Sequence, residues 1–138
     1  MYTNNVHQKR FQKTLAFLNQ NIEKGSHILD LGVQNPMSEL MKANGYKVEN
    51  THGEDLDEDQ TGLINSNAEV VTAFEILEHL LSPYHVLKSI RAKKLVVSVP
   101  LKIWFSGAYR SKTDMRDRHF HEFEDWQFNW LLGKTGWK

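Results

Sequence analysis

The stretch "AEVVTAFEILEHLLSP", residues 68–83, decides the fold, because a strand in it runs directly into a helical turn. Its first half is apolar and rich in β-branched residues, which is typical of a strand buried on both faces. Its second half carries Glu75, Glu78 and His79 at spacings i, i+3 and i+4, which would place them on one face of a helix. We expect either one continuous helix, or a helical turn followed by a helix after Pro83.

The same alternation of strand and helix extends along the chain. Further strands are expected at "HILDLG" (27–32), "YKVENTH" (46–52) and "KLVVSVP" (94–100). Helices are expected within residues 1–25, 35–45 and 124–137. Strands that are apolar throughout and alternate with helices indicate an α/β fold with a doubly wound, mostly parallel sheet and flanking helices. Residues 1–138 should therefore form a single domain.

Composition removes several classes of function. The chain has no cysteine, which excludes disulfides, thiolate metal sites and thiol nucleophiles. Acidic and basic residues balance at 17 each, so no global charge favours a nucleic-acid partner. No stretch reaches the roughly 18 to 20 apolar residues of a membrane helix, and the first ten residues lack the apolar core of a signal peptide. We expect a cytoplasmic protein with a small-molecule substrate and no membrane contact.

Four segments resemble successive landmarks of the class I S-adenosylmethionine-dependent methyltransferases. They are "ILDLG" (28–32), the opening stretch, "KLVVSVP" and "HFHEFEDWQFNWLLGKTGW" (119–137), and together they cover about residues 26–138. The resemblance implies a Rossmann-like sheet of about five strands with a short third strand and without the family's terminal strand pair. It also implies that S-adenosylmethionine is the cofactor.

The cofactor residues follow from the same resemblance. It places S-adenosylmethionine against Asp30, Gly32, Gln34, His52, Asp55, Phe74 and Glu75. The chain departs from the family pattern at Gln34 and Pro36, where glycines normally allow close approach of the ligand. It also has no acid in register at residues 50–52, so Glu54 or Asp55 would replace the acid that binds the ribose.

Three interpretations of the acid–acid–histidine cluster stay open. In the first, Glu78 and His79 only stabilise the start of a helix. In the second, Glu75 contacts the cofactor while His79 or His121 is the general base. In the third, Glu75, Glu78, His79 and His121 bind a divalent metal, as in related enzymes that act on the terminal ribose of small RNAs.

The segment 101–122 follows the last strand, where we expect a substrate lid. Trp104, Phe105 and Tyr109 would either stack on a planar substrate or pack in the core. Alternation would send His119 and His121 to one face, either at the substrate mouth or in solvent. In the last helix, Trp126, Trp130 and Leu131 have helical spacing and are predicted to be core.

The sequence thus predicts a methyltransferase that uses S-adenosylmethionine and acts on an unidentified, small acceptor. Two other functions remain open at this point. One is a non-catalytic relative with a degenerate cofactor site, suggested by Gln34 and Pro36. The other is a metal-supported RNA methyltransferase, which the zero net charge disfavours.

Overall fold

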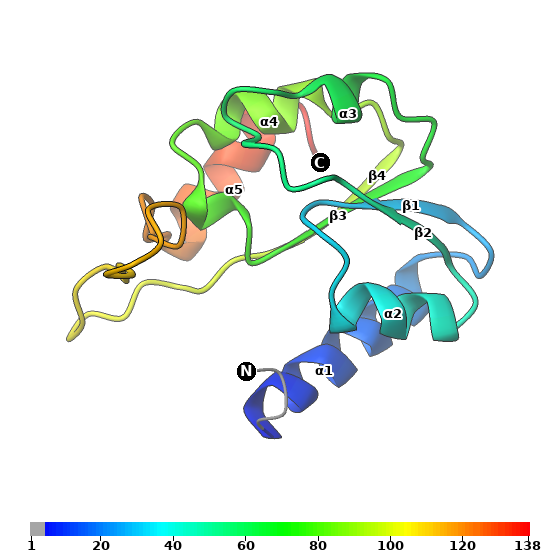
Figure 1. Cartoon of the computed structure of the whole chain (residues 1–138), viewed down its shortest axis with the longest axis horizontal. Helices are drawn as coiled ribbons and strands as arrows, with labels where there is room; N and C mark the ends of the chain where they lie inside the picture. The colour runs from blue at the N-terminus through cyan, green and yellow to red at the C-terminus, as the bar shows by residue number, and fades with distance from the viewer. Residues whose placement is uncertain (1–4) are drawn as a thin grey trace.

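The structure is a computed structural model that describes residues 5–138 (Figure 1). The helices are α1 (Asn5–Asn21), α2 (Pro36–Ala43), α3 (Thr61–Ile64), α4 (Pro83–Ser89) and α5 (Asp125–Lys134), with a 3₁₀ turn η1 (Leu77–His79). The strands are β1 (His27–Asp30), β2 (Lys47–Asn50), β3 (Val70–Phe74) and β4 (Lys94–Ser98). The first four residues of the expected N-terminal helix lie outside the described part.

The four strands form one parallel sheet in the order β2-β1-β3-β4. The chain moves outward from β1 to β2, crosses back to β3 and continues to β4, so the order reverses between β1 and β3. In register, Asp30 at the end of β1 faces Thr72 of β3 and Asn50 of β2. The predicted α/β, doubly wound, Rossmann-like fold is confirmed, and its switch point lies between the two central strands.

Helices cover both faces of the sheet (Figure 1). Helices α1 and α2 lie on one face, and α3, α4 and α5 lie on the other. Each layer has its own apolar cluster: Leu18 and Met41 pack with Ile28 on the first face, while Leu63 and Leu87 belong to the cluster on the second. The central strands β1 and β3 are buried along most of their length, whereas β2 alternates between exposed and half-buried residues as an edge strand does.

Local signals set the start of α2 as the sequence predicts. The side chain of Asn35 accepts hydrogen bonds from the backbone N–H groups of Met37 and Ser38, and Pro36 occupies the first helical position. The Ser38 hydroxyl in turn accepts a hydrogen bond from the backbone N–H of Asn35, which completes a capping box. Pro36 therefore has a structural role at the position where the family has a glycine.

The sheet has fewer strands than expected. Between β2 and β3 the described residues form turns and the single-turn helix α3, and no third strand. Side-chain hydrogen bonds account for this, because Asp59 and Asp55 accept from backbone N–H groups of Thr61 and Asp57 two residues on. These Asx-type turns compete with strand pairing.

The stretch after β3 follows the second of the two expected alternatives, a helical turn and then a helix beginning at Pro83. Glu75 lies before this turn with φ at +56°, in the left-handed region. Glu75 therefore does not share a helical face with Glu78 and His79, and that part of the spacing argument is wrong.

Two predictions about aromatic residues are also wrong. Trp126 and Trp130 are 65% and 66% exposed, because α5 turns a different face toward the sheet. That face carries Phe128, Leu131 and Leu132, which are half-buried and pack against the core cluster. Of these three, only Leu131 is predicted from the sequence to be core. The alternative that Trp104, Phe105 and Tyr109 form core fails as well, since they are at least half exposed.

Within residues 5–138, none of the helices combines the length and apolarity needed to cross a membrane.

Candidate functional site

A crevice opens at the carboxyl ends of β1, β2 and β3, where doubly wound sheets bind ligands. It consists of two hollows of about 320 and 710 Å³, sizes typical of small-molecule sites. The residues shared by both hollows are Gly32, Val33, Glu75 and Ile76. The hollow of about 320 Å³ is also lined by α1, and we name it the Arg10 hollow. The hollow of about 710 Å³ is also lined by the turns after β2, and we name it the Asp55 hollow.

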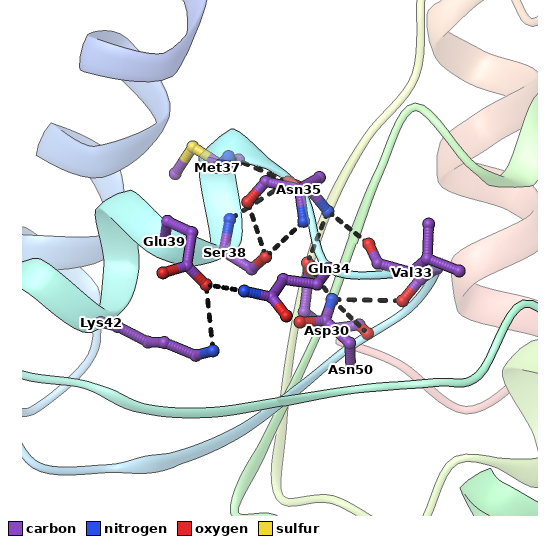
Figure 2. A network of polar contacts seen from close by, with 10 residues as sticks. Asp30, Val33, Gln34, Asn35, Met37, Ser38, Glu39, Lys42 and Asn50 are labelled. Carbon is purple, nitrogen blue, oxygen red and sulfur yellow. Dashed lines mark hydrogen bonds and ion pairs between the residues drawn. The ribbon is translucent and has the colours of Figure 1, made fainter.

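Asp30 ends β1 and is 2% exposed. Its Oδ1 accepts a hydrogen bond from Thr72 Oγ1 (2.6 Å). Its Oδ2 accepts from Asn50 Nδ2 (3.0 Å) and Asn35 Nδ2 (3.3 Å), which reach it from the end of β2 and the start of α2 (Figure 2). Burial raises the pKa of Asp30, and these hydrogen bonds oppose that rise. Asp30 lines the Arg10 hollow, but its carboxylate is occupied in joining three elements.

Gly32 lies where the chain turns from β1 toward α2, with φ at +102°. A Cβ added there would meet the nearest atom, Ile76 Cδ1, at 3.6 Å, so the conformation and not the space requires glycine. The backbone N–H of Gly32 donates to Thr51 Oγ1 (2.7 Å), and Asn50 Nδ2 donates to its carbonyl oxygen (3.1 Å). Asn50, in the stretch 50–52 where the resemblance would place a ribose-binding acid, thus holds the turn instead.

Two predicted cofactor residues lie outside the crevice. Gln34 and His52 line a separate shallow hollow beside β2. The Gln34 amide donates to Glu39 Oε1 at 2.6 Å, as Figure 2 shows. The His52 side chain is exposed, and its backbone N–H donates to Glu54 Oε2 (2.7 Å). The structure therefore does not bring these two side chains together with the other predicted residues.

The acids after β2 divide into two roles. Glu54 and Asp55 line the Asp55 hollow, and Asp55 is exposed. Asp57 lines the same hollow, but its carboxylate accepts hydrogen bonds from the backbone N–H groups of Leu81 and Ser82, both at 2.8 Å. Asp57 thereby ties the turns after β2 to the start of α4.

Glu75 stands between the two hollows, directly after β3. Its backbone N–H donates to the Ser98 carbonyl oxygen (2.9 Å), which continues the pairing with β4. Its Oε1 accepts a hydrogen bond from Arg10 Nη1 (3.3 Å), while its Oε2 is buried without a partner. A non-glycine residue with positive φ stores about 1–3 kcal/mol of strain, which concentrates at functional sites. Phe74, also predicted to contact the cofactor, lines the Arg10 hollow.

Glu78, His79 and His119 form a compact cluster at the edge of the Asp55 hollow, which His79 also lines. One potential ligand atom from each lies within 4.8 Å of the others. Glu78 is 1% exposed, and burial, followed by the nearby charges of Glu75 and Glu122, raises its pKa to about 8 despite an opposing backbone hydrogen bond. Burial and then the neighbouring His119 lower the pKa of His79.

Hydrogen bonds fix how both imidazoles of this cluster are oriented. His79 Nδ1 lies 3.0 Å from the Arg118 carbonyl oxygen. A carbonyl only accepts, so Nδ1 carries the proton and the Nε2 lone pair is left free. His119 Nδ1 lies 3.0 Å from Glu122 Oε1. When that carboxylate is ionised it can only accept, so Nδ1 of His119 carries the proton and its Nε2 lone pair is free as well.

His121 is not part of this cluster. Its Nε2 lies 3.1 Å from the Leu81 carbonyl oxygen, and its ring stacks on Phe123 at 5.7 Å between centroids. His119 contacts His79 instead, with ring centroids 4.8 Å apart. The expected alternation of the two histidines onto one face does not occur, because residues 119–121 form no strand.

The segment 101–122 contributes one wall of the crevice. The Arg116 guanidinium donates to the carbonyl oxygens of Gly53 (3.0 Å) and Glu54 (3.1 Å), which joins the segment to the turns after β2. The lining residues from this segment are Asp114, Met115, Arg116, Asp117 and Phe120. The segment thus lines part of the crevice, and its role as a substrate lid stays a prediction.

Sequence reasoning missed three residues of the site. Arg10 is on α1, far from the strand ends in sequence, and no motif marked it. Thr72 is the polar residue within the apolar run "VVTAF", a signal that a buried acceptor lies on a neighbouring strand. Arg116 lies in the segment 101–122, and no motif marks it either.

Comparisons with known proteins bear on the fold. No protein-family model matches the chain, and no curated protein matches it in sequence. Among solved structures, the chain is similar to one described as "Complex between the Haloferax volcanii Trm112 methyltransferase activator and the putative methyltransferase". The TM-score is 0.57 at 14% identity, over 94% of this chain and 70% of the other. This similarity shows a methyltransferase-like, Rossmann-type fold.

Proposed function

We propose that the chain binds S-adenosylmethionine in the crevice and transfers its methyl group to a small-molecule acceptor. The observation that carries this proposal is Glu75: a strained residue at the switch point, lining both hollows, with a buried carboxylate oxygen that has no partner. Orphaned buried acceptors and backbone strain together mark ligand sites. The fold similarity and the strand-end motifs support the choice of cofactor.

The residues of the crevice suit the chemical groups of S-adenosylmethionine. Its amino group and sulfonium are cationic, and Glu75 offers the unpaired carboxylate oxygen to such a group. Arg10 lines the same hollow and suits the carboxylate of the amino-acid part. In the Asp55 hollow, Glu54 and Asp55 offer acceptors for ribose hydroxyls. We therefore propose that the amino-acid part occupies the Arg10 hollow and the nucleoside part the Asp55 hollow.

When bound, S-adenosylmethionine supplies an electrophilic methyl group on sulfur. The chain's contribution is to align the acceptor with it and exclude water, which accounts for much of the acceleration of such transfers. The segment 101–122 would close over the acceptor. Of the two histidines predicted as general base, His79 lines the crevice and His121 does not. His79 therefore is the candidate to receive a proton from the acceptor.

Calorimetry with S-adenosylmethionine and with its demethylated product tests this proposal. We expect saturable binding with one site per chain. Glu75→Gln should weaken it about tenfold, which corresponds to the loss of one charged contact. Absence of binding of either compound at millimolar concentration would refute the proposal. Binding without transfer to any acceptor would favour the non-catalytic alternative.

A further inference from the structure

The cluster of Glu78, His79 and His119 has a feature that packing alone does not explain. Glu78 is 1% exposed, and its Oε2 has no hydrogen-bond partner. Its other oxygen, Oε1, lies 3.8 Å from His79 Nε2, too far for a hydrogen bond. Leaving a buried carboxylate unsatisfied costs about 1–3 kcal/mol or more. A ligand bound through this oxygen of Glu78 would remove that cost.

The two imidazoles are prepared to bind that group. Each uses Nδ1 toward a fixed acceptor, the Arg118 carbonyl oxygen for His79 and the Glu122 carboxylate for His119. Metal-bound histidines in proteins have this arrangement, in which the second nitrogen donates to a carbonyl or carboxylate and orients the ring. Glu122 Oε1 is itself held near the backbone N–H of Tyr109 (3.3 Å).

We propose that Glu78, His79 and His119 bind a divalent transition-metal ion. Two imidazoles and one carboxylate suit ions such as Zn²⁺, Fe²⁺, Co²⁺ or Mn²⁺, and three protein ligands leave positions open for water or a substrate oxygen. Mg²⁺ is disfavoured, because it prefers oxygen ligands. The set differs from the one expected from the sequence: His119 replaces His121, and Glu75 is paired with Arg10 instead.

The geometry requires a small contraction. The three ligand atoms lie within 4.8 Å of one another, whereas ligands around an ion bound at about 2.1 Å are roughly 3–4 Å apart. Side-chain torsions of Glu78 and His119 can supply this movement of about an ångström without a change of fold.

This inference does not depend on methyl transfer, since the ion is held by the chain alone. It does alter the role of His79, because an imidazole whose Nε2 lone pair binds an ion cannot accept a proton there. The ion would lie at the edge of the Asp55 hollow, which is proposed to hold the nucleoside part of S-adenosylmethionine.

The test is a Co²⁺ titration of the untagged, metal-stripped full chain, followed by visible absorption and by thermal unfolding. We expect one Co²⁺ per chain and a rise in Tm with Co²⁺ concentration, since the ion binds the folded state. His119→Ala should weaken Co²⁺ binding by more than about 100-fold, and Glu122→Gln by about 10- to 100-fold.

His121→Ala is the matched control, because it removes a histidine two residues away and should change the Co²⁺ Kd by less than about threefold. Circular dichroism and the metal-free Tm identify any variant that fails to fold. If His119→Ala fails to fold, the loss of Co²⁺ affinity is measured with Glu122→Gln instead, which changes the half-buried partner of His119. The proposal is overturned if Co²⁺ does not bind saturably, or if His121→Ala weakens binding as much as His119→Ala. Calorimetry with S-adenosylmethionine on the same metal-stripped protein keeps the two proposals separate.

Discussion

The turns after β1 and after β3 lie next to each other at the switch point but treat their buried acids in opposite ways. After β1, both carboxylate oxygens of Asp30 accept hydrogen bonds from neighbouring elements. After β3, Glu75 and Glu78 each keep one buried oxygen without a partner. The acid after β1 therefore has a structural role, whereas the two acids after β3 each keep an oxygen that could bind a ligand.

This contrast separates architecture from function better than the residue types do. All three positions carry a carboxylate in a strand-end motif. The resemblance assigns a cofactor-binding role to Asp30 and Glu75, and the sequence leaves Glu78 open between a structural and a metal-binding role. Only hydrogen-bond satisfaction distinguishes the acid that holds the fold from those available to a ligand. The predictions below measure the difference between the two turns.

The largest effect is expected from Asp30→Ala, which takes the acceptor of the buried Thr72 hydroxyl and one of the acceptors of Asn35 and of Asn50. Loss of a hub of this kind should lower the free energy of unfolding by about 3 kcal/mol and Tm by roughly 10 °C. Urea denaturation measures it. Glu58→Ala, at an exposed acid in the turns after β2, is the control and should cost less than about 0.5 kcal/mol. Equal losses of unfolding free energy in the two variants would contradict the structural role described for Asp30.

The next effect is the pH dependence of Glu78 in metal-free protein. Its pKa is raised to about 8 in the folded state, against 4.5 as the ordinary value for a free side chain. The folded state therefore holds a proton that the unfolded state releases. This contribution to stability is complete below pH 4.5 and declines as pH rises toward 8.

The decline should amount to a few kcal/mol across that window, at up to about 1.4 kcal/mol per pH unit. Glu78→Gln removes the titrating group, so the variant should gain stability relative to the natural sequence as pH increases. His79 acts in the opposite sense below its ordinary pKa, because burial disfavours its charged form. Urea unfolding of both proteins from pH 5 to 9 measures the difference, and parallel curves would show that Glu78 titrates normally.

A smaller effect separates stability from binding at Glu75. Glycine adopts the φ of +56° at this position without strain. Glu75→Gly should therefore change the free energy of unfolding by no more than about 1 kcal/mol, while S-adenosylmethionine affinity falls about tenfold. Chemical denaturation and calorimetry on the same sample measure the two quantities. A large loss of stability with unchanged affinity would place Glu75 with Asp30 among the structural acids.

The smallest effect is expected at Gln34, whose amide is bonded to Glu39 outside the crevice. Gln34→Ala should leave the S-adenosylmethionine Kd within about twofold and the free energy of unfolding within about 0.5 kcal/mol. Titration calorimetry checks the first quantity. A tenfold loss of affinity would show that the crevice extends beside β2, as the family resemblance implies.

The sequence predicts the order of strands and helices because the strands are apolar throughout and the start of α2 carries a complete set of local signals, Asn35 and Pro36 among them. It also locates the crevice, since the carboxyl ends of parallel strands meet at one edge. These inferences depend on local patterns and on a rule of topology, both of which can be seen along the chain.

The details of the site depend on contacts between distant segments and could not be derived in the same way. The positive φ of Glu75 interrupts the helical spacing that seemed to align it with Glu78 and His79. Choosing His119 over His121 requires the path of residues 101–118, which no periodicity describes. For α5, the spacing of Trp126 and Trp130 was as regular as that of Phe128 and Leu132, and only packing shows which face is buried.

The join between η1 and residues 118–121 has a consequence for how the molecule opens. The Glu78 carbonyl oxygen accepts hydrogen bonds from the backbone N–H groups of Phe120 and His121, and the Arg118 carbonyl oxygen accepts one from His79. These partners are about 40 residues apart in sequence, so forming the join closes a long loop at an entropic cost. Separation of this join alone would dismantle the cluster while the sheet stays folded. An ion bound by Glu78, His79 and His119 would hold the two sides of this join together. Amide hydrogen exchange at Phe120 would then slow as the fraction of protein with bound ion increases.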